Sequence, residues 1–141
     1  MRDTFRFIFP VFEMTAGVGR PLVAIVEDEP FMAELVRQML EASDVDVEVF
    51  HLGADFLNSP NLPVFKAIVL DLSLPDMEGF DVMDSMASKG IGGSVLVSSG
   101  HDTSIVVAAK IYGRGVGLKM CGALTKPFSQ AELLAALGLP A

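Results

Sequence analysis

Apolar residues recur along this chain in two alternating patterns. Residues 22–26 and 67–70 form short runs that are apolar throughout, which is typical of strands buried on both faces of a sheet. Between these runs, residues 31–40 carry apolar side chains at helical spacing, and Pro30 suits the first turn of a helix. The pattern therefore predicts a buried strand, a helix from Pro30 onward, and a second buried strand further along.

A different type of strand is predicted between the two buried runs. Residues 44–49 alternate between acidic and valine side chains, and a period of two with one polar side is typical of a half-exposed strand. Such a strand belongs at the edge of a sheet. A short amphipathic segment at residues 52–57 follows it, and Ser59 and Pro60 end that segment.

The rest of the chain continues the alternation of helix and strand. The further predicted elements are a helix over residues 78–89 that Gly90 ends, a strand at 95–97, a helix from Asp102 or Thr103 to about residues 113–117, a strand at 121–125, and a last helix that Ser129 and Glu132 cap. Strand–helix units of this kind predict an α/β fold in which helices cover both faces of a parallel sheet. With the half-exposed second strand at an edge, we expect a doubly wound (βα)5 sheet of strand order 2-1-3-4-5.

Composition and charge narrow the class of protein. The chain has 141 residues, of which 51% are hydrophobic, and a net charge of −8. These values predict a single folded domain and argue against direct contact with nucleic acid, which needs a basic face. A single cysteine fits a reducing compartment. Because no apolar run reaches the ~18–20 residues that cross a bilayer, we expect a cytoplasmic protein without a membrane partner.

Residues 1–20 differ in composition from the rest of the chain. They contain four phenylalanines and end in small residues, which predicts a flexible N-terminal extension before a domain at residues 21–141. A secretory signal is disfavoured because Pro10 interrupts the apolar stretch and Glu13 ends it. Two alternatives stay open: a translation start at Met14, and packing of the aromatic side chains onto the domain or a partner.

Polar side chains follow four of the predicted strands at the point where each strand ends. Glu27 and Asp28 follow the first strand, Asp71 the third, Ser99 the fourth and Lys126 the fifth. Each alone could be a helix-terminal charge or a turn residue, but the carboxyl ends of parallel strands meet at one edge of the sheet, where ligands bind. Converging carboxylates repel one another unless a cation compensates them.

A divalent cation with oxygen ligands fits such a site. Mg²⁺ is the natural candidate, because it takes one or two carboxylates together with water and phosphate oxygens. Lys126 would add a second positive charge and Ser99 a hydroxyl group. Together these groups would neutralise and hold a phosphoryl group on a carboxylate.

From Pro21 onward the chain resembles the receiver domain of two-component response regulators. Four blocks carry the resemblance: residues 26–30 (VEDEP), 68–79 (IVLDLSLPDMEG), 95–100 (VLVSSG) and 124–128 (LTKPF). The resemblance implies the flavodoxin-like form of the predicted fold. It also implies a stand-alone receiver, similar to the chemotaxis regulators, that works in a two-component phosphorelay.

The family resemblance assigns a role to each acidic residue. It implies that Asp71 accepts a phosphoryl group from a phosphohistidine on a sensor histidine kinase or a histidine phosphotransfer protein. Glu27 and Asp28 match the acidic pair that holds Mg²⁺. Asp71 would add a side-chain oxygen to the metal, and Ser73 its backbone carbonyl.

The resemblance also assigns roles to the residues that respond to the phosphoryl group. Lys126 matches the lysine that pairs with the phosphoryl oxygens, and its bond to Pro127 is expected to be cis. Ser99 matches the hydroxyl that moves toward the phosphoryl group and so shifts the fourth strand and helix. For His101, two residues later, two interpretations stay open: an exposed residue near the start of the next helix, or a residue that affects the lifetime of the phosphoryl group. Ala123 stands where the family often has an aromatic residue, which leaves open how the shift is transmitted.

The resemblance implies signalling, and no enzymatic activity beyond self-catalysed phosphoryl transfer and slow autodephosphorylation. The expected downstream partner is a protein of unknown identity that binds the fourth helix, fifth strand and fifth helix, and a homodimer stays open. The alternative is an interaction module that works without phosphorylation. A flavin carrier is disfavoured because acidic residues 27–29 follow the first strand. An aspartate-nucleophile phosphatase is disfavoured because Ser73 stands where a second aspartate is needed.

Overall fold

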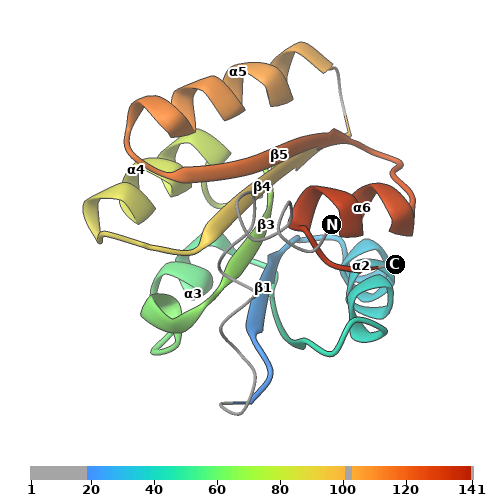
Figure 1. Cartoon of the computed structure of the whole chain (residues 1–141). Helices are drawn as coiled ribbons and strands as arrows, with labels where there is room; N and C mark the ends of the chain where they lie inside the picture. The colour runs from blue at the N-terminus through green and yellow to red at the C-terminus, as the bar shows by residue number, and fades with distance from the viewer. Residues whose placement is uncertain (1–18, 101–102, 141) are drawn as a thin grey trace.

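A computed structural model describes residues 19–100 and 103–140, and its centre is a five-stranded sheet (Figure 1). The strands are β1 (Leu22–Val26), β2 (Asp46–Phe50), β3 (Ala67–Asp71), β4 (Ser94–Ser99) and β5 (Lys119–Thr125). All neighbouring strands are parallel, in the order β2-β1-β3-β4-β5. This confirms the predicted strand order and places the half-exposed strand β2 at an edge.

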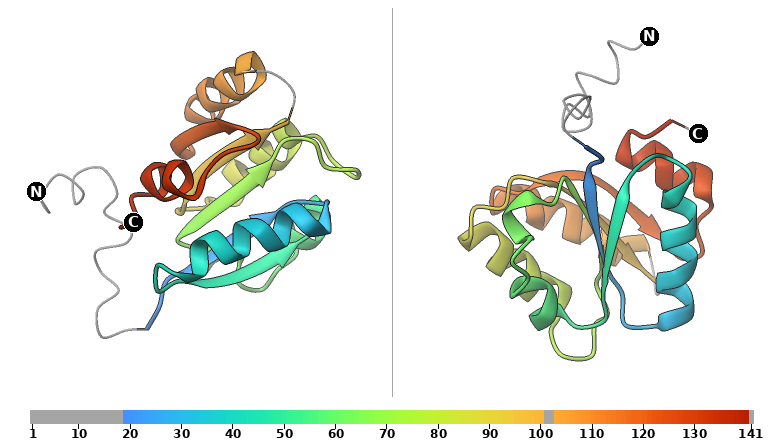
Figure 2. Two further views of the ribbon diagram at one scale, coloured as in Figure 1. Left: turned by 90° about the vertical axis from the view of Figure 1, so that its right-hand side faces the viewer. Right: turned by 90° about the horizontal axis from the view of Figure 1, so that it is seen from below.

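Helices cover both faces of the sheet. They are α2 (Pro30–Glu41), α3 (Gly53–Leu57), α4 (Gly79–Ser88), α5 (Thr103–Gly115) and α6 (Gln130–Leu137), with a 3-10 turn at Leu62–Val64. The right-hand view of Figure 2 shows α2 and α6 on one side of the sheet and α3 and α4 on the other, where α5 packs beside α4. This is the predicted doubly wound α/β arrangement.

The core consists of two apolar clusters, one on each face of the sheet. Side chains of a strand point alternately to its two faces. In β1, Ala24 and Val26 therefore pack with α3, α4 and α5, whereas Val23 and Ile25 pack with α2 and α6. Since both faces are covered, all of β1 and the first four residues of β3 are apolar, which explains the uninterrupted runs in the sequence.

Several predicted boundaries are confirmed, and others are wrong by one or two residues; β4, for example, runs from Ser94 to Ser99 and not over 95–97. Gly90, which follows the C-cap residue Lys89 of α4, has a φ of +69°, and Ser129 and Glu132 form a capping box at α6. The prediction for the fifth strand starts two residues late, because β5 begins at Lys119. Of the described residues, none belongs to a helix that is long and apolar enough to cross a membrane.

Some sequence-based expectations fall outside the described residues. These are the structure of the N-terminal extension up to residue 18, the role of His101, and Asp102 as a cap for α5. The described part of α5 begins at Thr103. It continues through Gly113, where an added Cβ would lie 2.3 Å from the sulfur of Met120. The glycine thus allows α5 to approach β5 closely.

Asp76 ties the loop after β3 to the first turn of α3. Its carboxylate accepts hydrogen bonds from the backbone N–H groups of Gly53 (2.9 Å) and Ala54 (3.0 Å). Leu52, the N-cap residue of α3, has no polar side-chain atom to serve these donors. The hydrogen bonds from Ala54 and Gly53 lower the pKa of the Asp76 carboxyl.

Replacement of Asp76 by asparagine is expected to lower the thermal midpoint at pH 7. Because the pKa of Asp76 is lowered in the folded state, its stabilisation is complete above the ordinary value of 3.8 and is lost as the pH falls through the lowered value. The difference between the wild type and Asp76→Asn should therefore shrink below about pH 4. Thermal unfolding followed by circular dichroism from pH 3 to pH 7 measures this difference in thermal midpoint. Equal midpoints of the two proteins at pH 7 would contradict the stabilising role of Asp76.

Candidate functional site

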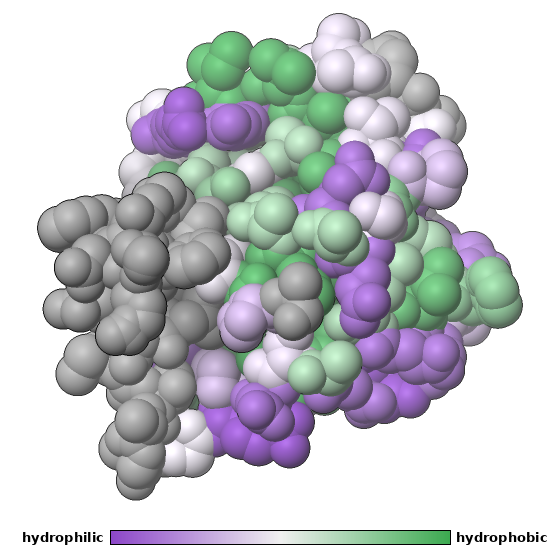
Figure 3. Space-filling model, turned by 45° about the vertical axis from the view of Figure 1, so that its right-hand side comes forward, coloured by the Kyte–Doolittle hydropathy of each residue, from purple (hydrophilic) through white to green (hydrophobic). Residues whose placement is uncertain are grey.

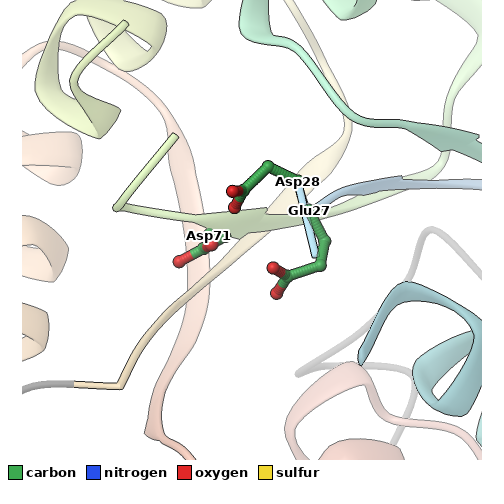
Figure 4. A group of neighbouring side chains, drawn as sticks. All are labelled: Glu27, Asp28 and Asp71. Carbon is green, nitrogen blue, oxygen red and sulfur yellow. The ribbon is translucent and has the colours of Figure 1, made fainter. Parts of the chain in front are cut away.

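Three carboxylates converge at the carboxyl ends of β1 and β3. The two strands are neighbours, and Val26 pairs with Leu70, so that Glu27 and Asp71 leave the sheet side by side. Figure 4 shows these two side chains and Asp28 projecting into one space. An oxygen atom from each of the three lies within 4.8 Å of the others. The predicted convergence of these residues is thus present in the fold.

The two central carboxylates are almost completely buried. Glu27 and Asp71 are each 4% exposed. The backbone N–H of Glu27 donates to the carbonyl oxygen of Phe50 at 2.9 Å, and the carbonyl oxygen of Glu27 lies 2.8 Å from Nδ1 of His51. These contacts with the end of β2 hold the backbone of Glu27 in place. The contact with His51 could not be predicted from the sequence, because residues 27 and 51 meet only in the folded sheet.

Lys126 reaches both buried carboxylates from the end of β5. Its Nζ donates a hydrogen bond to Oε1 of Glu27 and lies 3.4 Å from Oδ2 of Asp71. Its backbone N–H donates to the carbonyl oxygen of Ser99 at 2.8 Å, so the lysine is anchored to β4. The peptide bond from Lys126 to Pro127 is cis, as expected.

The site favours a cation of higher charge than one ammonium group. Burial raises the pKa of Glu27, and the neighbouring Asp71 acts in the same direction, whereas Lys126 opposes both. The three carboxylates carry more negative charge than Lys126 neutralises. Their oxygen atoms are the hard donors that Mg²⁺ prefers, so these residues fit the predicted metal.

Asp71 is held in a fixed orientation by the loop that follows it. Its Oδ1 accepts a hydrogen bond from the backbone N–H of Ser73 at 3.1 Å, while Oδ2 faces Lys126. Ser73 is exposed and pairs with Glu78 in an isolated antiparallel bridge. Gly79 is required next to this bridge, since an added Cβ would lie 2.8 Å from Cα of Leu72.

Ser99 lies at the end of β4, close to the acidic cluster. Asp71 pairs with Ser98, which places Ser99 one residue further along the neighbouring strand. Ser99 is 1% exposed and lines a pocket of about 410 Å³. The other lining residues are Leu72, Ser73, Leu74, Glu78, Gly79, Phe80 and Ile105. The sequence could not reveal this pocket, because its walls come from the loop after β3, the start of α4, the end of β4 and the first turn of α5.

The family of this chain is established by comparison with known proteins. Residues 23–138 match the family model of the response regulator receiver domain. The chain therefore belongs to the response regulator receiver family and is a signalling domain of the two-component type.

Known relatives and structures agree with this assignment. The chain is 29% identical over 113 residues to the cell cycle response regulator CtrA of Brucella ovis, which covers 80% of the chain and 47% of the relative. It thus spans about half the length of the curated relatives it matches. The receiver domain of a putative Luxo repressor protein from Vibrio parahaemolyticus is 28% identical, with a TM-score of 0.72 over 84% of this chain and 87% of that one.

A second solved structure supports the same fold. A response regulator from Colwellia psychrerythraea is also 28% identical, with a TM-score of 0.73 over 83% of this chain and 93% of that one. The flavodoxin-like receiver fold predicted from the sequence is therefore confirmed.

Proposed function

We propose that this receiver domain accepts a phosphoryl group on Asp71 in a Mg²⁺-dependent reaction. One observation carries the proposal: the buried carboxylate of Asp71 lies 3.4 Å from Nζ of Lys126 and within 4.8 Å of the carboxylate oxygens of Glu27 and Asp28. A carboxylate so placed has a cation on one side and a metal-binding acidic pair on the other. The proposed donor is a phosphohistidine on a histidine kinase or phosphotransfer protein.

In the proposed reaction, one carboxylate oxygen of Asp71 forms a bond to phosphorus while the phosphorus–nitrogen bond of the donor breaks. The electron pair of the broken bond stays on the imidazole nitrogen, which takes up a proton. Lys126 neutralises charge on the phosphoryl oxygens, and the hydroxyl of Ser99 binds one of them. When bound by Glu27, Asp28, Asp71 and the backbone carbonyl of Ser73, Mg²⁺ would supply further charge neutralisation.

The proposed output is binding of a protein partner or relay of the phosphoryl group. Figure 3 shows hydrophobic side chains gathered along the upper edge of the molecule, where α5 lies. On α5, Val107 is 47% exposed and Ile111 65% exposed, and clustered apolar residues of this kind mark interaction surfaces. A second copy of the chain in a homodimer would bind through the same exposed apolar residues of α5. The proposal places the chain in the cytoplasm, where ATP-dependent kinases form phosphohistidine.

Intact-mass spectrometry of the whole chain tests the proposal. After incubation with Mg²⁺ and acetyl phosphate, the wild type should gain the mass of one phosphoryl group. Asp71→Asn should gain none, and the wild type should gain none when EDTA removes the metal. An adduct of equal yield on Asp71→Asn would rule out Asp71 as the acceptor.

One observation favours a second candidate, an interaction module that works without phosphorylation. Ala123, half-buried on β5, pairs with Val97 of β4 and offers no large side chain to follow a movement of Ser99. Absence of any adduct, together with unchanged thermal stability upon addition of Mg²⁺ and beryllofluoride, would support this second candidate.

A further inference from the structure

Helices α4 and α5 are joined by a contact between three side chains, which we name the aromatic latch: Phe80, Asp84 and Tyr112. Phe80 and Asp84 lie four residues apart, on one face of α4. The Tyr112 hydroxyl on α5 donates a hydrogen bond to Oδ1 of Asp84. The rings of Phe80 and Tyr112 meet edge to face, with their centroids 5.3 Å apart.

The latch borders the pocket that Ser99 lines. Phe80 lines the same pocket as Ser99 and as Ile105 in the first turn of α5. Ile105 and Tyr112 lie seven residues apart, which places them on one side of α5, two turns from each other. A displacement of Ser99 therefore changes the wall of a pocket that Phe80 and Ile105 also line.

The latch also provides aromatic rings that can respond to a movement of Ser99, which β5 lacks at Ala123. Ala123 provides no ring that could follow Ser99, and Tyr112 is the single tyrosine of a chain without tryptophan. A shift of α5 relative to α4 that exceeds the short range of these contacts breaks the hydrogen bond to Asp84 and the ring contact with Phe80.

We propose that the aromatic latch holds α5 against α4 and opens when Ser99 moves toward a phosphoryl group on Asp71. Phe80, Asp84 and Tyr112 are thus positioning residues that set the equilibrium of the switch. Loosening the latch makes the shifted arrangement easier to reach, and so strengthens the binding of any ligand that requires it. This inference rests on the proposed phosphorylation of Asp71.

Beryllofluoride, a phosphoryl mimic, provides the first test. Its affinity for the whole chain in the presence of Mg²⁺ is measured by ¹⁹F nuclear magnetic resonance for wild type, Tyr112→Phe, Asp84→Asn and Asp81→Asn. Loss of one hydrogen bond predicts about two- to tenfold tighter binding for Tyr112→Phe and Asp84→Asn. Asp81→Asn removes the same charge from the same helix; Asp81 acts on Tyr112 through its charge and is not the hydrogen-bond acceptor of the latch, so this variant should bind like the wild type.

The fluorescence of Tyr112 provides the second test, since it is the sole tyrosine. Hydrogen bonding to a carboxylate quenches tyrosine, so Mg²⁺ and beryllofluoride should raise its emission in the wild type and in Asp81→Asn. In Asp84→Asn the emission of Tyr112 should already be higher than in the wild type before Mg²⁺ and beryllofluoride are added.

The outcomes separate the two proposals. A wild type that binds no beryllofluoride would overturn the phosphorylation of Asp71, and the latch with it. A wild type that binds, with unchanged or weaker affinity in Tyr112→Phe and Asp84→Asn, would overturn the latch alone. So would unchanged Tyr112 emission upon binding.

Discussion

Asparagine at position 28 should remove about half or more of the stabilisation that Mg²⁺ gives to the wild type. The Asp28 carboxylate lies within 4.8 Å of those of Glu27 and Asp71, and one charge that contacts a cation near a protein surface contributes on the order of 1 to 4 kcal/mol to its binding. We expect the dissociation constant of Mg²⁺ to rise at least about tenfold. At a concentration 100 times the wild-type constant, the stabilisation would then fall from about 2.7 to about 1.4 kcal/mol or less.

Thermal unfolding with and without Mg²⁺, at constant ionic strength, measures this effect. Asp44→Asn is the matched control, because Asp44 is exposed and precedes β2, at the opposite end of the sheet from the site. Its φ of 58° is one that asparagine adopts readily. If Asp28→Asn kept the full stabilisation, or if Asp44→Asn also lost it, the metal would have to bind elsewhere.

Methionine at position 126 should slow phosphorylation of Asp71 by about 100- to 1000-fold, the usual effect of removing one group that stabilises transition-state charge. Methionine keeps much of the length of lysine but removes the ammonium group that lies 3.4 Å from Asp71. The same change should leave Mg²⁺ binding as tight as in the wild type or tighter, because the ammonium no longer competes for the Glu27 carboxylate.

The rate is followed by intact mass with acetyl phosphate as donor, and Mg²⁺ binding by thermal shift. Lys119→Met is the control: Lys119 is exposed at the start of β5, whereas Lys126 follows its end. Loss of phosphorylation and of Mg²⁺ binding together would show a general disturbance of the site. A wild-type rate in Lys126→Met would contradict the role of the ammonium group.

The sheet could be predicted from the sequence because the burial of each strand face decides which residue types that strand contains. Both faces of β1 are covered by helices, so each of its residues must be apolar. The alternation of acidic and valine residues at 44–49 indicates that one face of β2 is open to solvent. The start of β5 could not be predicted in this way. Lys119 enters the strand because it pairs with Ser94 of β4, a contact between residues far apart in the sequence.

The same distinction applies to the site. Glu27, Asp71 and Lys126 could be predicted to converge, because parallel topology brings the ends of strands together whatever the intervening sequence. Asp76 and the aromatic latch could not. Asp76 serves the N–H groups of a helix more than twenty residues earlier, and nothing in the local pattern of α4 or α5 pairs Phe80 with Tyr112.

The most direct test of the proposed chemistry locates the phosphoryl group on the chain. Borohydride reduces an aspartyl phosphate to homoserine, and peptide mass spectrometry then identifies the altered position. We expect homoserine at position 71 alone, in samples that contained both Mg²⁺ and acetyl phosphate. An unaltered Asp71, with the label at another residue or at none, would contradict the assignment of Asp71 as the phosphoryl acceptor.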